Sequence, residues 1–366
     1  MGRSTGHNLR HGTPCPQRLR GDSLAAPSFS AAASPGPAAL ASPQDRSGGS
    51  DRPVQAPPIE VLRDCQVDKP TELFSVLWVV DGDTIHIERG GKREKLRLLS
   101  IDTEEKYNKG NVSETKPYTR FGEQATGWAQ GFLMPRSPED GQVMVGLRFP
   151  GGVEAYDIYG RLLCHVVTAE GIDFNLLMVR TGLSPYFNKY GNSRIDHTRF
   201  VELAAKAKSE RRGIWDQRTN EGGKRRPYGR LIPWWQARAD AIDAHRVKAS
   251  EAPLRYVAAD DPDALEASLA NGPERVTVLA LVDRFFEEDD GSRTVLLRSG
   301  DKRRSLRVSI PKDQREAMAR HDLDHAKEDF RQNYFLIDGT LKRGKRGFDL
   351  TGVGVDDWRL AGPGPR

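Results

Sequence analysis

From about residue 72 the chain changes to short segments in which apolar residues dominate or alternate with polar ones. LFSVLWVV is rich in β-formers and runs into an Asp-Gly turn. TIHIE alternates, so that Ile85 and Ile87 share one face of a strand. A Gly-Gly pair then predicts a hairpin turn, and KLRLLSI returns as the next strand.

Further along, FGEQATGWAQGFLM, FNLLMVRTGL and TRFVELAAKAKSERRGIW have helical spacing, and GQVMVGLRF and GRLLCHVVT read as two more strands. Short strands with interposed helices indicate an α+β, mainly β domain over 72–216, with a five-stranded OB-fold barrel and helices packed around it. We expect a basic linker with helices over 217–273, where DQRTNEGGKRRPYGRL is polar and WWQARADAIDAHRV and DALEASLA are helical. Residues 274–361 alternate again and favour a second small β-rich, OB-like domain, with a helix over 312–330.

Residues 1–58 are rich in Pro, Ala and Ser, have no hydrophobic period, and predict a disordered tail. The Ala-rich part is broken by Pro and Ser, so it makes no convincing signal peptide, and no apolar run has the length of a membrane span. We therefore expect no membrane partner and leave the localisation open.

The composition, 37% hydrophobic and 29% charged, is typical of a soluble globular protein. The formal net charge of +5 mildly favours a polyanionic partner. Cys15, Cys65 and Cys164 are widely spaced and predict neither a disulfide framework nor a zinc site.

Acidic residues occupy both far ends of the predicted hairpin. Asp83 begins one strand and Asp102 follows the other, so pairing about the Gly-Gly turn would bring them together. Two carboxylates with a nearby carbonyl or hydroxyl form an oxygen-rich site suited to Ca²⁺. The alternative is that Asp81 and Asp83 only form a turn and Asp102 only caps a loop.

Two arginines raise a similar choice. Arg97 alternates with Leu96 and Leu98 and so points to the other face of the sheet, and Arg161 starts a different strand after a Tyr-Gly turn. Each is either an exposed residue or a bidentate ligand for a phosphate. Carboxylates that hold a metal, a spare carboxylate and two arginines are what phosphodiester hydrolysis requires.

In order and spacing, DGDT, RLLSIDTEE, YGRLL, VRTGLSPY and RRGIW resemble the staphylococcal nuclease (thermonuclease) family over about 72–216. The resemblance implies an OB-fold enzyme that cleaves DNA and RNA with Ca²⁺ and leaves 3′-phosphate ends. It also implies that Asp83, Asp102 and the Thr103 carbonyl bind the calcium, and that Asp81 lies next to these ligands without binding the ion itself.

By the same resemblance, Glu105 orients or activates water and Arg97 and Arg161 bind the scissile phosphate. The resemblance also gives Tyr159 and Tyr186 contacts with the nucleotide. One departure is Glu104, which stands where the family has proline. A neighbouring carboxylate there could compete for the metal or for the role of base.

Other readings stay open. A nuclease-fold module could bind nucleic acid or protein without cutting, and the C-terminal domain, with its basic runs DKRRSLR and LKRGKRG, could bind either or serve as the main scaffold. His321 and His325 are spaced i,i+4, but with no third ligand a solvated helix face is preferred.

Overall fold

The computed structural model describes residues 56–107, 113–135, 141–157, 159–299, 304–323 and 333–362. The tail predicted over 1–58 therefore lies outside the described residues except for 56–58, and so does His325. Within the described ranges, no helix is both long enough and apolar enough to cross a membrane.

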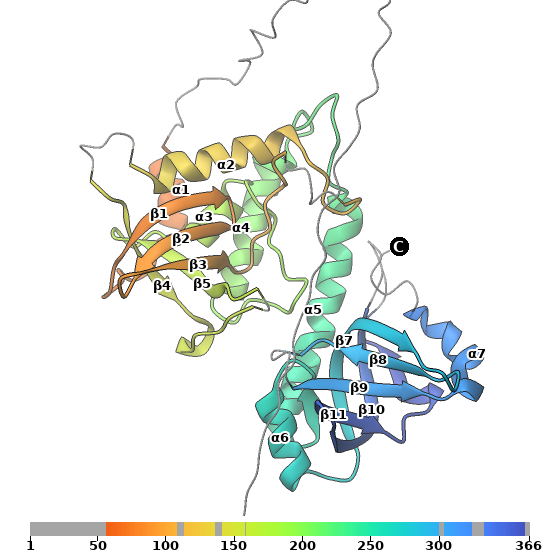
Figure 1. The fold of residues 1–366 in the computed structure, drawn as a ribbon. Coiled ribbons are helices and arrows are strands. Elements are labelled where there is room, and N and C mark those ends of the chain that lie inside the picture. The colour runs from red at the N-terminus through yellow and green to blue at the C-terminus, as the bar shows by residue number, and fades with distance from the viewer. Residues whose placement is uncertain are drawn as a thin grey trace, which may run out of the picture. The chain divides into compact units, whose positions relative to one another are not determined.

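Five strands close into a first barrel, whose members in Figure 1 are β1 (Phe74–Asp81), β2 (Thr84–Arg89), β3 (Lys92–Leu98), β4 (Met144–Arg148) and β5 (Leu162–Thr168). Their order around the barrel is β1-β2-β3-β5-β4. β3 and β5 run parallel, and the other neighbours are antiparallel. The predicted five-stranded OB-fold barrel is confirmed.

A tight turn sets the register of β2 against β3. Gly90 and Gly91 join β2 to β3 with φ of 58° and 71°, the backbone that a type I′ turn needs and that glycine adopts without strain. The resulting register places Arg97 opposite Thr84. The far end of β3 is thereby held beside the turn that joins β1 to β2.

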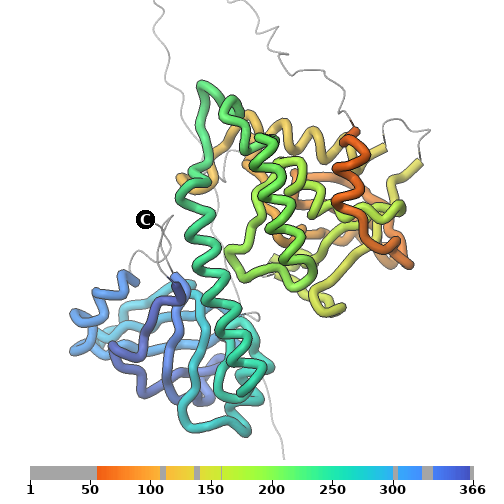
Figure 2. Tube along the Cα trace, turned by 180° about the vertical axis from the view of Figure 1, so that it is seen from behind, coloured from red at the N-terminus to blue at the C-terminus, as the bar shows by residue number. Residues whose placement is uncertain are grey.

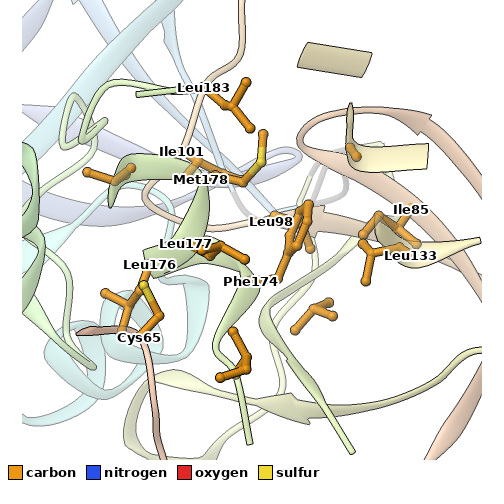
Figure 3. Packing of buried hydrophobic residues seen from close by; sticks show 14 of the residues in the cluster. Cys65, Ile85, Leu98, Ile101, Leu133, Phe174, Leu176, Leu177, Met178 and Leu183 are labelled. Atoms are coloured by element: carbon orange, nitrogen blue, oxygen red, sulfur yellow. The ribbon is translucent and has the colours of Figure 1, made fainter. Parts of the chain in front are cut away.

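Four helices accompany the barrel: α1 (Ile59–Asp64), α2 (Arg120–Leu133), α3 (Phe174–Arg180) and α4 (His197–Ser209). The sequence pattern predicts all of them except α1. Thr119 caps α2 and Asp173 caps α3, each accepting from a backbone N–H three residues on. The buried hydrophobic side chains of α3 lie in one cluster with residues of the barrel strands and with Cys65, and Figure 3 shows part of this cluster.

The segment expected as a linker with helices contains α5 (Tyr228–Glu251) and α6 (Pro262–Asn271). Figure 2 shows α5 as one uninterrupted helix, although Pro233 lies inside its second turn. The first turns of α5 pack on the domain that precedes them, because Leu231, Trp234 and Trp235 form a cluster with Phe187.

A second barrel follows, built from β7 (Val276–Glu287), β8 (Arg293–Leu297), β9 (Ser305–Ile310), β10 (Tyr334–Gly344) and β11 (Gly347–Thr351). β10 pairs with both β11 and β7, and β9 runs parallel to β11. The order β7-β8-β9-β11-β10 repeats that of the first barrel, so the OB-like prediction is confirmed. β6 (Tyr256–Ala258) and β12 (Trp358–Leu360) extend the sheet.

The helix predicted over 312–330 is shorter in the structure. α7 (Arg315–Met318) lies between two 3₁₀ turns, Lys312–Gln314 and Ala319–His321, and residues 324–332 lie outside the described part. His321 interacts with the Val355 carbonyl at 3.0 Å.

Other 3₁₀ turns of the described residues cover Pro150–Gly152, Gly213–Trp215 and Val355–Asp357.

Candidate active site

The β1–β2 turn and the loop after β3 are bonded directly to each other. The Asp83 carbonyl accepts from the Leu98 N–H at 2.9 Å, and Asp83 Oδ2 accepts from the Thr103 N–H and hydroxyl at 3.0 and 3.3 Å. Asp81 Oδ1 accepts from the Asp83 N–H at 3.1 Å. Burial, and then the charge of Asp83, raise the pKa of Asp81 to about 7. The two ends of the hairpin therefore meet, as its pairing predicts.

Arg97 joins the two carboxylates at this junction. Its Nη1 forms an ion pair with Asp83 Oδ1, and its Nη2 lies 3.0 Å from Asp102 Oδ1. Nη2 also donates to the Ile101 carbonyl at 3.3 Å. Because one planar guanidinium reaches both, the carboxyl oxygens of Asp83 and Asp102 face the same small volume.

Lys116 links Asp102 to Glu105. Its Nζ lies 2.9 Å from Asp102 Oδ1 and 2.7 Å from Glu105 Oε1. Glu105, the carboxylate expected to orient water, is thus held beside Asp102, one of the two aspartates that Arg97 joins. Lys116 belongs to a polar loop without periodicity, so the sequence pattern gave no reason to select it.

Arg226 is a second unpredicted member of the site. Its Nη2 pairs with Asp102 Oδ2, its Nη1 donates to the Asp102 carbonyl at 3.0 Å, and its Nε donates to the Thr115 carbonyl at 2.9 Å. In the sequence it is one residue of the KRR run in a segment expected as a linker. The structure places it in the site, only 6% exposed.

These cations determine the ionisation of the two aspartates. Burial opposes the charge of Asp102, but Lys116, Arg226 and Arg97 outweigh it and hold the pKa of that carboxyl well below its ordinary range. Burial also opposes the charge of Asp83, and Arg97 and then Lys116 lower its pKa. Both aspartates are therefore carboxylates at neutral pH.

Glu104 points to a different set of partners. Its Oε2 accepts from the Thr119 hydroxyl and from Asn220 Nδ2 at 2.8 Å, and its Oε1 accepts from the Tyr228 hydroxyl at 3.1 Å. The residue is 3% exposed. With these donors on both oxygens, Glu104 is an anchor between the loop, the start of α2 and the segment before α5. The geometry gives no support to competition with Glu105.

Comparison with known proteins shows what this arrangement is similar to. Residues 95–217 match the family model described as Staphylococcal nuclease homologue. These residues make up most of the domain built on the first barrel, which we call the nuclease homologue domain.

Named relatives agree with this assignment of the domain. Endonuclease YhcR of Bacillus subtilis (strain 168) is 33% identical over 141 residues, which are 38% of this chain and 11% of that protein. The thermonuclease of Staphylococcus hyicus is 26% identical over 145 residues, 39% of this chain and 76% of that protein. The thermonuclease of Staphylococcus intermedius is 29% identical over 152 residues, 40% of this chain and 77% of that protein. The chain thus spans about a tenth of the endonuclease and about three quarters of each thermonuclease.

Arg161 lies on the same face of the sheet as Arg97. The β3–β5 register pairs Arg97 with Leu163, so Arg161, two residues earlier, falls on the face of the sheet that carries Arg97. Arg161 is held by Asp157, with Nη2 at 2.6 Å, and lies over the Tyr159 ring at 5.5 Å. Tyr159 is 75% exposed and its ring is open to a ligand.

Tyr186 is placed differently from the expectation. It is 8% exposed, its ring stacks on Phe200 at 4.9 Å, and its hydroxyl interacts with His197 Nδ1 at 2.9 Å. The hydroxyl also accepts from the Ser193 N–H at 2.8 Å. A tyrosine packed and bonded in this way belongs to the core, and the expected nucleotide contact finds no support in this geometry.

The donors of the nuclease homologue domain fit a hard cation. Asp83 and Asp102 offer only oxygen, both are ionised and buried, and both face the volume that the Arg97 guanidinium reaches. A second set of donors lies elsewhere in the chain. Among the described residues, His165, Asp173 and Asp196 have ligand atoms within 4.8 Å of one another.

Like Asp83 and Asp102, that second group is paired with a cation of the protein, but it lies where strands and helix starts meet. Arg148 Nη1 lies 2.8 Å from Asp173 Oδ2 and 2.7 Å from Asp196 Oδ2, and His165 Nδ1 lies 2.9 Å from Asp173. Because Asp173 also caps α3, the group ties β4 and β5 to the starts of α3 and α4. We interpret it as structural.

Proposed function

We propose that the protein is a calcium-dependent nuclease that hydrolyses phosphodiester bonds of DNA, RNA or both and leaves 3′-phosphate ends. The observation that carries the proposal is the convergence of Asp83 and Asp102 on Arg97, with Glu105 held at the same carboxylate by Lys116. The match to the nuclease homologue family and the relatives named endonuclease and thermonuclease support the same class of reaction.

In this proposal, Asp83, Asp102 and the Thr103 carbonyl hold the calcium ion. The ion, when bound, supplies positive charge that offsets the negative charge on the phosphate in the transition state. Oxygen donors alone suit calcium better than zinc, which prefers His and Cys ligands.

The remaining side chains act on the substrate. In the structure the Arg97 guanidinium bonds to Asp83 and Asp102. In the proposed enzyme it binds phosphate oxygens, and Arg161, on the same face and directly before β5, binds the same group. Glu105 orients the attacking water and accepts its proton. Lys116 keeps the Glu105 carboxylate at the site, and the exposed ring of Tyr159 stacks on a base.

A digestion assay tests this function. The full chain is incubated with supercoiled plasmid, single-stranded DNA and RNA, first with calcium and then with a calcium chelator. Cleavage is expected only with calcium, and the products are expected to prime a polymerase only after a phosphatase has removed their 3′-phosphates. A Glu105→Gln variant purified in the same way controls for contaminating nucleases.

Each contrary result has a definite meaning. Cleavage that persists in chelator contradicts the metal assignment, and products that prime without phosphatase contradict the 3′-phosphate assignment. Tight nucleic-acid binding without cleavage would favour the module that binds without cutting.

A further inference from the structure

The segment after the nuclease homologue domain lies on the loop that carries the proposed catalytic carboxylates. The family match ends at residue 217. Beyond it, Asn220, Arg226 and Tyr228 all bond to Asp102 or Glu104. These three side chains therefore contact the site from outside the family's domain.

Arg226 uses every nitrogen of its guanidinium on this loop. Nη1 and Nη2 bind the carbonyl and the Oδ2 of Asp102, and Nε binds the Thr115 carbonyl. One side chain thus holds both the beginning of the loop and the residue that directly precedes Lys116.

The surroundings fix the guanidinium in place. It is 6% exposed, and its Cζ lies 5.2 Å from the centre of the Trp235 ring and 5.6 Å from that of Tyr228. A buried cation is costly unless it is paired and hydrogen-bonded, so removing it from these partners would be strongly unfavourable. Arg226 is consequently part of a built site rather than a mobile surface residue.

Glu104 provides the second attachment of the same segment. It accepts from Tyr228 and Asn220, and Asn220 Oδ1 in turn accepts from the Phe121 N–H in the first turn of α2, at 2.9 Å. The residue that departs from the family's proline is therefore one of those that hold the extra segment to the loop.

We propose that Asn220, Arg226 and Tyr228 complete the active site and that Arg226 is a positioning residue for Asp102; this inference rests on the proposed function. By binding Oδ2, Arg226 leaves Oδ1 of Asp102 turned toward Arg97 and Lys116. By binding the Thr115 carbonyl, it also fixes the backbone from which Lys116 reaches Glu105.

The test uses the full chain and two variants, Arg226→Gln and the matched control Arg225→Gln. Arg225 is exposed and donates to the Gln217 carbonyl, away from the carboxylates. For each protein, turnover and KM are measured with calcium, calcium binding is measured by calorimetry without substrate, and the melting temperature is recorded.

Turnover of Arg226→Gln is expected to fall by about 10- to 100-fold with little change in KM, because the aspartate and Glu105 lose their alignment. Calcium is expected to bind the variant at least as tightly, because a positive charge has been removed from beside Asp102. Arg225→Gln should match the unaltered protein in all measurements.

Three results would overturn the inference. If Arg226→Gln cleaves like the unaltered protein, the residue does not position the site. If Arg226→Gln loses calcium binding and its melting transition together with turnover, the role of Arg226 is only structural. Arg226→Lys keeps the positive charge without the fork, so it repeats the comparison of turnover in a folded protein. If the unaltered protein neither binds calcium nor cleaves, the proposed function fails first and this inference falls with it.

Discussion

Arg97 and Asp102 form a partly buried ion pair in which Nη2 of the guanidinium lies 3.0 Å from Oδ1 of the carboxylate. Because the other arm of the same guanidinium binds Asp83, a point charge cannot replace it. We expect Arg97→Lys to lower turnover by about 10²- to 10³-fold, as the loss of a preorganised charge donor does. The unfolding free energy should fall by about 1.5–3 kcal/mol for the lost charge-assisted bond.

Steady-state cleavage and urea unfolding check both numbers. Lys95→Arg is the matched control, since Lys95 lies two residues earlier on the same strand and is exposed. Near-normal turnover of Arg97→Lys would move the phosphate site elsewhere.

Glu104 and Glu105 are adjacent, yet their partners predict opposite effects of the same substitution. Glu105→Gln should reduce turnover by about 10²- to 10⁴-fold, the range for losing a general base, with little effect on stability. Glu104→Gln presents an amide to hydroxyl and amide donors, and we expect it to cost about 1–3 kcal/mol of unfolding free energy. Turnover and urea unfolding of both variants measure the contrast. A larger loss of turnover from Glu104→Gln would reverse the two roles.

The alternation of apolar and polar residues along the strands predicts the positions of Arg97, Asp83 and Asp102 in the site. Alternation around Leu96 and Leu98 puts Arg97 on the opposite face, and two-residue turns bring the ends of the hairpin together. A period of two fixes which face a side chain occupies, so a local pattern suffices for residues on paired strands. The short β-rich segments of the C-terminal region predict the second barrel for the same reason.

The loop residues of the site have no such signal. Lys116 and Arg226 sit in polar stretches without period, and Arg226 reaches Asp102 across 124 positions of the sequence. Tyr186 is assigned to the nucleotide from the family resemblance alone, and no local pattern indicates that the fold stacks its ring on Phe200. Contacts of this kind depend on tertiary packing, which composition and spacing do not encode.

Tyr186 and Tyr159 are both expected from the family resemblance to bind nucleotide, but the first is buried and the second exposed, and substitutions at the two positions test what this difference means for substrate binding. Tyr186→Phe removes a hydroxyl bonded to His197 and Ser193, and should cost about 1–2 kcal/mol of stability while leaving KM unchanged. Tyr159→Ala removes an exposed ring and should weaken substrate binding by about 1–3 kcal/mol, with no effect on the melting temperature. Cleavage at several concentrations of a short single strand, together with thermal melts, separates the outcomes. A raised KM for Tyr186→Phe would return that residue to the substrate site.

The pair of Asp173 and Arg148 predicts how stability depends on pH. Burial opposes the charge of Asp173, but His165, the Leu176 N–H and Arg148 together lower the pKa of the carboxyl below its ordinary value of 3.8. A group whose pKa is lower in the folded state contributes stability above its ordinary value, and that stability is lost as the pH falls toward the folded value. Asp173→Asn keeps an oxygen to cap α3 but removes the charge, and we expect it to cost about 3 kcal/mol at pH 7, as breaking a buried pair does.

Urea unfolding of the parent chain and of Asp173→Asn, followed from pH 7 down past the ordinary value of 3.8, measures this contribution. The difference between the two proteins should be constant at neutral pH and shrink below that value, because the parent carboxyl then becomes protonated in the unfolded state. A difference that does not change with pH would show that the charge of Asp173 is not its source.

Urea unfolding of the same two proteins with added zinc tests whether this group binds a metal ion. Stabilisation of the parent alone would mean that His165, Asp173 and Asp196 bind a metal, whereas the Arg148 contacts predict no effect.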